Sequence, residues 1–217
     1  MAVGYNPRAV TDGLVLALDA GNTKSYPGSG STWTDLSGNG NNGTLENDVG
    51  YDSGNGGALS FDGLNDYMSI DLPAPASTPF TFEFWINPDV DNPVGLFDTA
   101  PGQQQVIRNY NAGEVEWWSD DPNINLGLTA GNWYHLVFEF SYTTQRVVKY
   151  YRNGSLISTS IGTSDPVFAW TNFTIGNING GNAGWYDGKL GGFRFYERAL
   201  TAEEIQQNYN ALKGRYA

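Results

Sequence analysis

The sequence predicts an all-β sandwich that folds as a single domain over residues 1–217. Three observations favour this class. Glycine is abundant, with 28 residues, and tyrosine and tryptophan contribute 13 and 7. Charged residues make up only 16% of the chain, a composition that suits short strands joined by tight turns. Apolar segments of strand length recur throughout, and this length is ordinary for one undivided sandwich.

The expected strands are short apolar runs bounded by glycine, proline, asparagine or aspartate. In chain order they cover residues 14–18, 58–61, 67–70, 80–87, 133–142, 147–152, 155–158, 173–176 and 189–196. Phe80 and Phe82 begin the clearest alternation, in which every second side chain points to one face. Asn153-Gly154 predicts a type I′ hairpin, because both turn residues must take a positive φ. Two segments without such a pattern are expected to be long loops, residues 89–101 and 180–188.

A C-terminal helix is expected over residues 201–213, and residues 1–12 are expected to form an N-terminal arm. Thr201 and Glu204 have the spacing of a capping box, in which each side chain bonds the backbone N–H of the other residue. An apolar stripe follows at helical spacing, made of Ile205, Tyr209 and Leu212. A short helix packed on the sandwich is the natural interpretation.

Charge and composition exclude several classes of function. The formal net charge is −12, and 11 basic residues are too few for a surface that binds the phosphates of nucleic acid. Cysteine is absent, so neither a disulfide nor a thiolate metal site is expected. The first seven residues lack the features of a signal peptide, and no apolar run is long enough to cross a membrane. These features fit synthesis in a reducing cytoplasm.

Six segments occur in an order that resembles the laminin-G-like (concanavalin A-like lectin/glucanase) domains. They are DLSGNGNNG at 35–43, FDGLNDY at 61–67, FTFEFWI at 80–86, GNWYHL at 131–136, YRNG at 151–154 and FYERALTAEEI at 195–205. The resemblance covers nearly the whole chain. It implies a jelly roll of two antiparallel sheets packed face to face.

The two chain ends, residues 13–22 and 207–216, also resemble such domains in tailed-phage virion proteins. This resemblance predicts a non-enzymatic virion protein, made in the host cytoplasm and serving as a capsid-decoration, neck or fibre-associated module. It would attach to surfaces or stabilise the particle, with other virion proteins or cell-surface glycans as partners, and could form a homo-oligomer. The alternative is a free, calcium-dependent carbohydrate-binding lectin, and a glycoside hydrolase is the least favoured class.

Catalytic residues are not expected. The glycosidases of the family resemble Glu-x-Asp-x-x-Glu on one strand, and no such run occurs here. The run closest to this pattern contains Glu114 and Glu116, but its acidic residues differ from the pattern in spacing and order. Strand alternation would place Glu114 and Glu116 on one face, roughly 7 Å apart. The single histidine, His135, is expected to be structural. Gly191-Gly192 stands where the family often has an acidic residue before the last strand, which puts any role of that acid in doubt.

Two loops could bind calcium, the most plausible ion for this sequence. The first has oxygen-bearing side chains at the spacing of a calcium loop, with the candidate ligands Asp35, Ser37, Asn39, Asn41 and Glu46. Its flanks are not helical, and the alternative is a Gly/Asn turn whose side chains bond the backbone. The second has the candidate ligands Asp62, Asn65 and Asp66.

Sugar binding requires an exposed aromatic ring beside polar side chains. Trp117 and Trp118 are adjacent, and adjacent residues of a strand point to opposite faces. Either one of the two rings leaves the core, or the strand is buried on both faces. A second candidate set lies in a glycine-rich segment and consists of Trp185 and Tyr186 with Asn182 and Asp187. The alternative for both sets is ordinary packing inside the sandwich.

Overall fold

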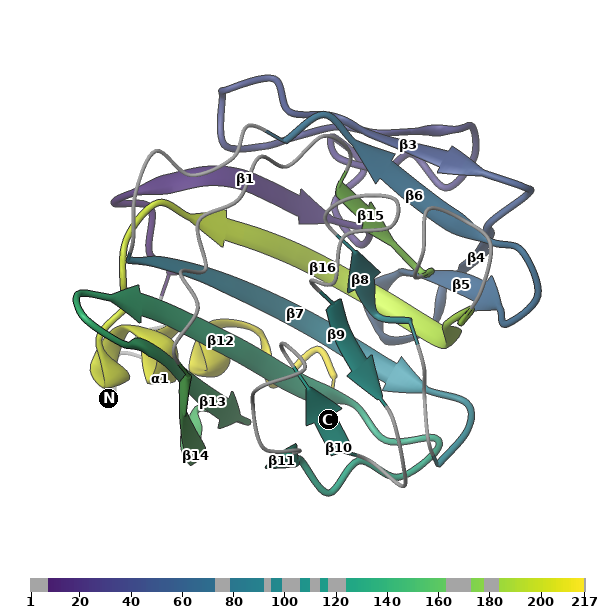
Figure 1. The fold of residues 1–217 in the computed structure, drawn as a ribbon. Coiled ribbons are helices and arrows are strands. Elements are labelled where there is room, and N and C mark those ends of the chain that lie inside the picture. Colours follow the sequence, from purple (N-terminus) through teal and green to yellow (C-terminus); the bar gives the residue numbers. More distant parts are fainter. Residues whose placement is uncertain are drawn as a thin grey trace, which may run out of the picture.

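The computed structural model describes residues 8–72, 79–91, 95–98, 106–109, 114–116, 124–162, 173–177 and 184–216. In these residues, two antiparallel sheets pack face to face and a C-terminal helix lies against one of them (Figure 1). The predicted all-β jelly-roll sandwich is confirmed. Among the described residues, no helix has both the length and the apolar character needed to cross a bilayer.

The first sheet has the strand order β14-β13-β12-β7-β16-β5-β4, and β1 also pairs with β16. Its strands are β1 (Leu14–Asp19), β4 (Gly50–Asp52), β5 (Ala58–Asp62), β7 (Phe80–Pro88), β12 (Tyr134–Tyr142), β13 (Arg146–Arg152), β14 (Ser155–Gly162) and β16 (Asp187–Tyr196). β16 is long enough to pair with β7 along one edge and with both β5 and β1 along the other. It therefore joins the first and last parts of the chain.

The second sheet has the order β11-β10-β9-β8-β15-β6-β3-β2. Its strands are β2 (Thr32–Trp33), β3 (Gly43–Glu46), β6 (Tyr67–Ile70), β8 (Phe97–Asp98), β9 (Val106–Asn109), β10 (Glu114–Glu116), β11 (Ile124–Asn125) and β15 (Phe173–Ile175). A short 3-10 helix, η1 (Gly54–Gly56), precedes β5.

Aromatic rings from both sheets form the core between them. Phe84 of β7 stacks on Phe193 of β16 with ring centroids 4.7 Å apart, and on Phe97 of β8 at 5.3 Å. Phe173 of β15 stacks on Phe193 at 5.4 Å. Stacking of aromatic rings stabilises a core beyond the burial of apolar area. The alternation in residues 80–87 predicted this inward face of β7.

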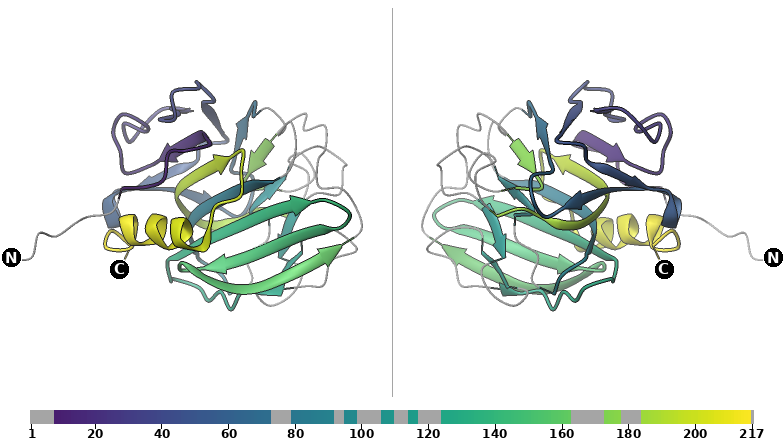
Figure 2. Two further views of the ribbon diagram at one scale, coloured as in Figure 1. Left: turned by 90° about the vertical axis from the view of Figure 1, so that its left-hand side faces the viewer. Right: turned by 90° about the vertical axis from the view of Figure 1, so that its right-hand side faces the viewer.

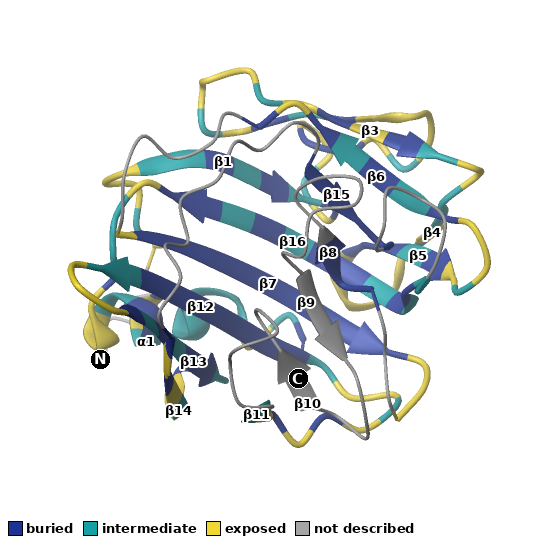
Figure 3. Ribbon diagram, in the orientation of Figure 1, coloured by how far each residue is buried: buried dark blue, intermediate teal, exposed yellow. Residues whose placement is uncertain are grey.

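The opposite face of β7 is also buried, because the C-terminal helix α1 (Ala202–Leu212) covers it (Figures 2 and 3). Glu83 on this face accepts hydrogen bonds from Arg194 Nη1 at 2.5 Å and from Asn208 Nδ2 at 2.6 Å. Burial acts to raise the pKa of Glu83, but Arg194, His135 and Asn208 outweigh it and lower that pKa to about 2. Glu83 is thus a buried anion that fastens the helix to the sheet.

His135 also lies under the helix, with Nε2 3.2 Å from Glu83 Oε1 and no solvent exposure. Beside it, the ring of Tyr216 stacks on Trp85 with centroids 4.4 Å apart. Tyr216 also explains Gly191, because a Cβ at that position would lie 2.2 Å from the Tyr216 hydroxyl oxygen. A glycine therefore allows the end of the chain to pack closely over β16.

The sequence patterns that predicted the Asn153-Gly154 hairpin and the capped C-terminal helix are confirmed. Asn153 and Gly154 have φ values of 53° and 78°, as a type I′ turn requires. Thr201 caps α1, and its capping box with Glu204 is complete.

The expectation of long loops at 89–101 and 180–188 was wrong in part. β8 lies within the first segment, and β16 begins inside the second. Five further short strands were not expected, namely β2, β3, β4, β9 and β11. These strands have two to four residues, too few to show alternation, and pairing with their neighbours in the sheet determines them.

Candidate functional site

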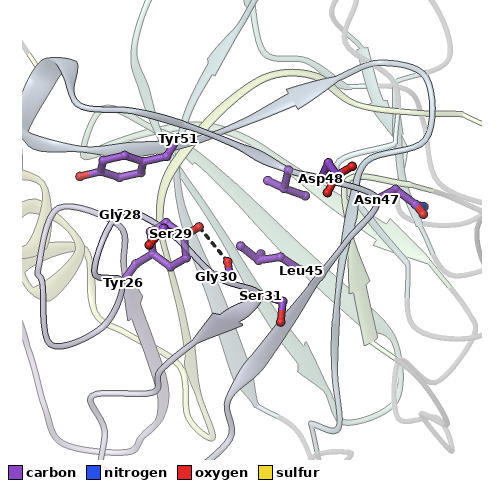
Figure 4. Close-up of a pocket in the computed structure, with 10 residues that line it drawn as sticks. Tyr26, Gly28, Ser29, Gly30, Ser31, Leu45, Asn47, Asp48 and Tyr51 are labelled. Atoms are coloured by element: carbon purple, nitrogen blue, oxygen red, sulfur yellow. Dashed lines mark hydrogen bonds between the residues drawn. The ribbon is translucent and has the colours of Figure 1, made fainter.

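An open pocket of about 650 Å³ lies where the chain crosses from the second sheet to the first. We call it the tyrosine pocket. Residues from 26–31 and from 45–51 line it, including Tyr26, Asp48 and Tyr51 (Figure 4). In the figure the two tyrosines lie at one end, and Asp48 lies at the other beside Asn47.

Tyr51 presents the aromatic surface of the pocket. It lies on the edge strand β4 with 38% of its surface exposed, and its ring centroid is 5.5 Å from that of Tyr26. Tyr26 is almost fully buried and donates a hydrogen bond from its hydroxyl to the Gly30 carbonyl oxygen at 2.9 Å. Burial and the neighbouring Tyr51 raise the pKa of Tyr26. Tyr26 therefore packs against the Tyr51 ring, and its hydrogen bond to Gly30 fixes the loop of residues 26–31 that forms one wall of the pocket.

That loop depends on two glycines. Gly28 and Gly30 both have a φ of 94°, a conformation that other residues rarely adopt. The Tyr51 ring also packs over Gly28, where an added Cβ would lie 3.4 Å from the ring. The backbone can therefore turn tightly beneath Tyr51 and leave the exposed side chains of Ser29 and Ser31 on the pocket wall.

The polar end of the pocket has an uncommon backbone conformation. Asn47 and Asp48 are consecutive, and their φ values are 62° and 67°. Asparagine and aspartate tolerate this left-handed region better than other residues that carry a side chain. Asn47 Nδ2 donates to the Asn65 carbonyl oxygen at 2.9 Å, which ties this corner to the loop after β5. The corner places an exposed amide and an exposed carboxylate at the pocket.

The chemistry available in the pocket is therefore recognition by stacking and hydrogen bonding. The lining residues offer one exposed aromatic face, serine hydroxyls, an amide and a carboxylate, but no histidine, lysine or arginine.

The first loop predicted to bind calcium is a turn packed on β1. The Asp35 carboxylate accepts hydrogen bonds from the backbone N–H groups of Ala17, Ser37 and Asn41 and from the Ser37 hydroxyl. Asn39 and Asn41 both donate to the Val15 carbonyl oxygen at 3.0 Å. These contacts match the turn named as the alternative to a calcium loop.

Glu46 does not close that loop. It is the last residue of β3 and pairs with Tyr67 of β6. With Asp35 engaged by four donors and Glu46 in the sheet, the donor set of the first loop does not fit a calcium ion.

The second predicted loop keeps its carboxylates near one another. Asp62 Oδ1 accepts the N–H of Leu64 at 2.8 Å, and such backbone hydrogen bonds lower the pKa of Asp62. Burial, and then the charges of Asp62 and Asp48, raise the pKa of Asp66. Asn65 is exposed between them. Even so, nowhere in the described part of the chain do three or more acidic or histidine side chains gather as a metal site would require.

The residues predicted to contact sugar differ in their location and in their exposure to solvent. Trp117, Trp118 and Asn182 lie outside the described residues. Trp185 is half-buried, with its ring 6.3 Å from that of Tyr67. Asp187 begins β16, and burial together with Asp89 and Asp62 raises its pKa.

Tyr186 was wrongly predicted as part of a sugar platform. It has no exposed surface, and its ring contacts Phe61 of β5 edge-on at 6.0 Å. Because Trp185 and Tyr186 are neighbours, the chain turns only one of the two rings toward solvent.

Sequence reasoning missed all four principal residues of the tyrosine pocket: Tyr26, Asn47, Asp48 and Tyr51. They come from separate loops and a three-residue strand, so no periodic pattern unites them. The adjacent pair Asn47-Asp48 was the one available signal, since both residues favour turns with positive φ.

Comparison with known proteins places the fold in context. The family model of the concanavalin A-like lectin/glucanases superfamily matches residues 61–206, which is more than half of the chain. No curated protein is similar enough in sequence to count as a relative.

Several solved structures are similar to the chain. The receptor-binding domain of botulinum neurotoxin C/D mosaic serotype has a TM-score of 0.69 at 17% identity, over 92% of this chain and 51% of that one. A structure of botulinum neurotoxin type C, whose cell entry depends on two ganglioside molecules, has a TM-score of 0.67 at 16% identity, over 94% and 52%. The chain thus spans about half the length of these neurotoxin domains.

Domain 4 of AbnA, an extracellular arabinanase from Geobacillus stearothermophilus solved with arabinotriose, is similar over nearly its whole length. The TM-score is 0.64 at 21% identity, and the match covers 90% of this chain and 98% of that one. At such identities these likenesses establish the fold, and the pocket residues precede the segment that the family model matches.

Proposed function

This chain belongs to the concanavalin A-like lectin/glucanases superfamily, and we propose that it is a non-enzymatic domain that binds a glycan in the tyrosine pocket. The observation that carries the proposal is the exposed ring of Tyr51 at one end of a pocket that holds Asn47 and Asp48 at the other. A sugar ring needs an aromatic surface for its C–H face and polar groups for its hydroxyls. The volume lies within the range of roughly 300–1,000 Å³ that small-molecule sites occupy.

Two structural neighbours add support from the fold. One was solved with arabinotriose, and another belongs to a toxin that depends on gangliosides for cell entry. A sandwich of this kind can therefore present a glycan site.

The direct test is Tyr51→Ala against a panel of oligosaccharides that includes arabinotriose. Loss of the stacking surface should weaken binding by about tenfold, equal to about 1.4 kcal/mol. The matched control is Tyr51→Phe, which keeps the ring and should bind within about threefold of the wild type. Thermal melting of each variant separates lost binding from lost folding. Undiminished binding by a folded Tyr51→Ala would show that the glycan sits elsewhere, with the Tyr67–Trp185 pair as the next candidate.

We further propose that the domain is part of a phage virion, in a capsid-decoration, neck or fibre-associated position. Support comes from the sequence resemblance of residues 13–22 and 207–216 to domains of tailed-phage virion proteins. In this setting the glycan would lie on the host surface, and neighbouring virion proteins would be partners. The protein should then copurify with particles at a symmetric copy number, whereas its absence from purified virions would favour a free lectin.

Calcium is proposed at the second loop, since the Asp62 N–H donates to Asp66 Oδ2 at 3.1 Å and the loop thus holds both carboxylates, with Asp62 and Asn65 exposed. Excess calcium should then raise the melting temperature relative to EDTA, because an ion that binds only the folded state stabilises it by mass action. Asp62→Asn should remove the shift. Coincident melting curves for the wild type would reject calcium at either predicted loop.

The non-enzymatic part of the proposal has its own test. Glu114 and Glu116 are the candidate carboxylates of a hydrolase, and their backbone lies in β10. The wild type should release no reducing sugar from β-glucans. Release that is lost in Glu116→Gln would establish the hydrolase class instead.

A further inference from the structure

We infer that the tyrosine pocket selects uncharged glycans and rejects glycans that carry carboxylate or sulfate groups. This inference rests on the proposed function, because it concerns the ligand of the same pocket. Asp48 carries the only formal charge among the side chains that line the pocket, all of which belong to the described part of the chain. An anionic ligand would therefore meet a carboxylate and no cation.

The acidic character continues beyond the pocket wall. Asn47, which precedes Asp48, donates a hydrogen bond to the Asn65 carbonyl oxygen at 2.9 Å, so the loop after β5 lies against the polar end of the pocket. In that loop the Asp62 N–H donates to Asp66 Oδ2 at 3.1 Å, and burial, followed by the charges of Asp62 and Asp48, raises the pKa of Asp66. The loop beside the polar end of the pocket thus adds two aspartates, Asp62 and Asp66, to the negative charge of Asp48 that an anionic glycan would meet.

Two described cations contact residues that neighbour the pocket in sequence, Lys189 at Asp52 and Arg215 at Asn55 and Gly57, and each is paired with a carboxylate. Lys189 Nζ pairs with Asp52 Oδ2 at 2.6 Å, and Arg215 Nη1 pairs with Asp19 Oδ1 at 2.6 Å. Both charges are therefore matched by a carboxylate. Lys24 lies two residues before Tyr26, but its side chain does not line the pocket.

An uncharged glycan has what the pocket requires. Its hydroxyls can donate to the Asp48 carboxylate, and charge-assisted hydrogen bonds of this kind are stronger than neutral ones. Its C–H face can lie on Tyr51. A uronate or sulfate group has no proton to donate at neutral pH, so it gains nothing from Asp48 and is repelled by it.

Asp48→Asn tests the charge with little other change. The φ of 67° at this position favours asparagine as much as aspartate, so the backbone is preserved. The amide keeps one acceptor oxygen for a sugar hydroxyl. Asp71→Asn is the matched control, because Asp71 is exposed and follows β6 at the end opposite Tyr67. It removes one negative charge from the protein without touching the pocket.

The experiment compares neutral oligosaccharides with counterparts that differ by one uronate or sulfate group. At low salt, the wild type should bind the acidic member about five- to tenfold more weakly, as expected for one like charge at contact distance in water. Asp48→Asn should bring this ratio toward one, and Asp71→Asn should leave it unchanged. The ratio should also shrink between about 10 mM and about 150 mM salt, as the screening length falls from about 30 Å to about 8 Å.

The outcomes separate this inference from the proposed function. Equal binding of neutral and acidic members by the wild type, or a ratio unaffected by Asp48→Asn, would overturn the selectivity while leaving glycan binding intact. Binding of no oligosaccharide of either kind, or undiminished binding by Tyr51→Ala, would overturn the proposed function itself.

Discussion

Single residues in this domain are constrained by neighbours that are distant in sequence. Gly191 illustrates the point, since its φ is not positive and its constraint is space alone. Tyr216 lies 25 positions later and occupies the volume where a Cβ would stand. Tyr186 is a second case, because its ring is buried against that of Phe61, which lies 125 positions earlier in the chain.

Gly191→Ala should therefore displace Tyr216 from its stack on Trp85. Overpacking of this kind costs about 1–3 kcal/mol, measurable by urea unfolding, and should change the tryptophan fluorescence. Gly214→Ala is the control, because no atom lies within 4 Å of a Cβ there. In a Tyr216→Ala background the cost of Gly191→Ala should nearly vanish, and additive costs would contradict the proposed clash.

At the scale of elements, α1 is attached to the sandwich by a polar side chain rather than by its apolar stripe alone. Asn208 has no solvent exposure and donates to Glu83 Oε2 at 2.6 Å and to the Tyr196 hydroxyl oxygen at 3.1 Å. Its Oδ1 accepts the Val10 N–H at 2.8 Å. One asparagine thus connects the helix, two strands and the N-terminal segment.

Asn208→Ala should destabilise the domain by about 2–4 kcal/mol, because it removes the donor to the buried Oε2 of Glu83 and leaves the Val10 N–H without its acceptor. Thr201→Ala, which removes only the helix cap, should cost about 1 kcal/mol. Asn210→Ala is the matched control on the same helix and should be close to neutral. Unfolding midpoints measure all three, and equal midpoints for the variants at positions 208 and 210 would refute this role of Asn208.

For the whole molecule, the buried anion between sheet and helix links stability to pH. The folded-state pKa of Glu83 is about 2, below its ordinary value of 4.5. The carboxylate therefore stabilises the fold fully above pH 4.5, and this contribution is lost as the pH falls from 4.5 toward 2. The shift corresponds to roughly 3 kcal/mol.

Glu83→Gln should consequently lower stability at pH 6 and flatten the loss of stability between pH 5 and about 2.5, since the variant has no proton to take up at this site. At neutral pH the cost should be about 3–5 kcal/mol, because Arg194 is left without its anion. The matched control is Glu203→Gln, an exposed glutamate of α1, which should keep the wild-type pH profile. An unchanged profile in Glu83→Gln would contradict the assignment.

The sequence by itself determined the sandwich, most of the longer strands, the Asn153-Gly154 hairpin and the capped helix. Each of these follows from interactions between residues close in the chain: alternation along a strand, positive φ in a two-residue turn, and side chains that bond nearby N–H groups. Residues 35–46, which were predicted to bind calcium, show the limit of such patterns. In the structure their Asp35, Asn39 and Asn41 side chains form hydrogen bonds with the backbone of their own turn and of β1.

Only the tertiary structure decided which side chains meet. Tyr26, Asp48 and Tyr51 form one pocket because β3 and β4 belong to different sheets, and the crossing between them brings their loops together. Glu83 and Asn208 are 125 positions apart, and neither is distinctive in the sequence. The physical reason is that pocket and core contacts depend on how distant strands pair and which face each element buries, and local sequence does not encode these long-range contacts.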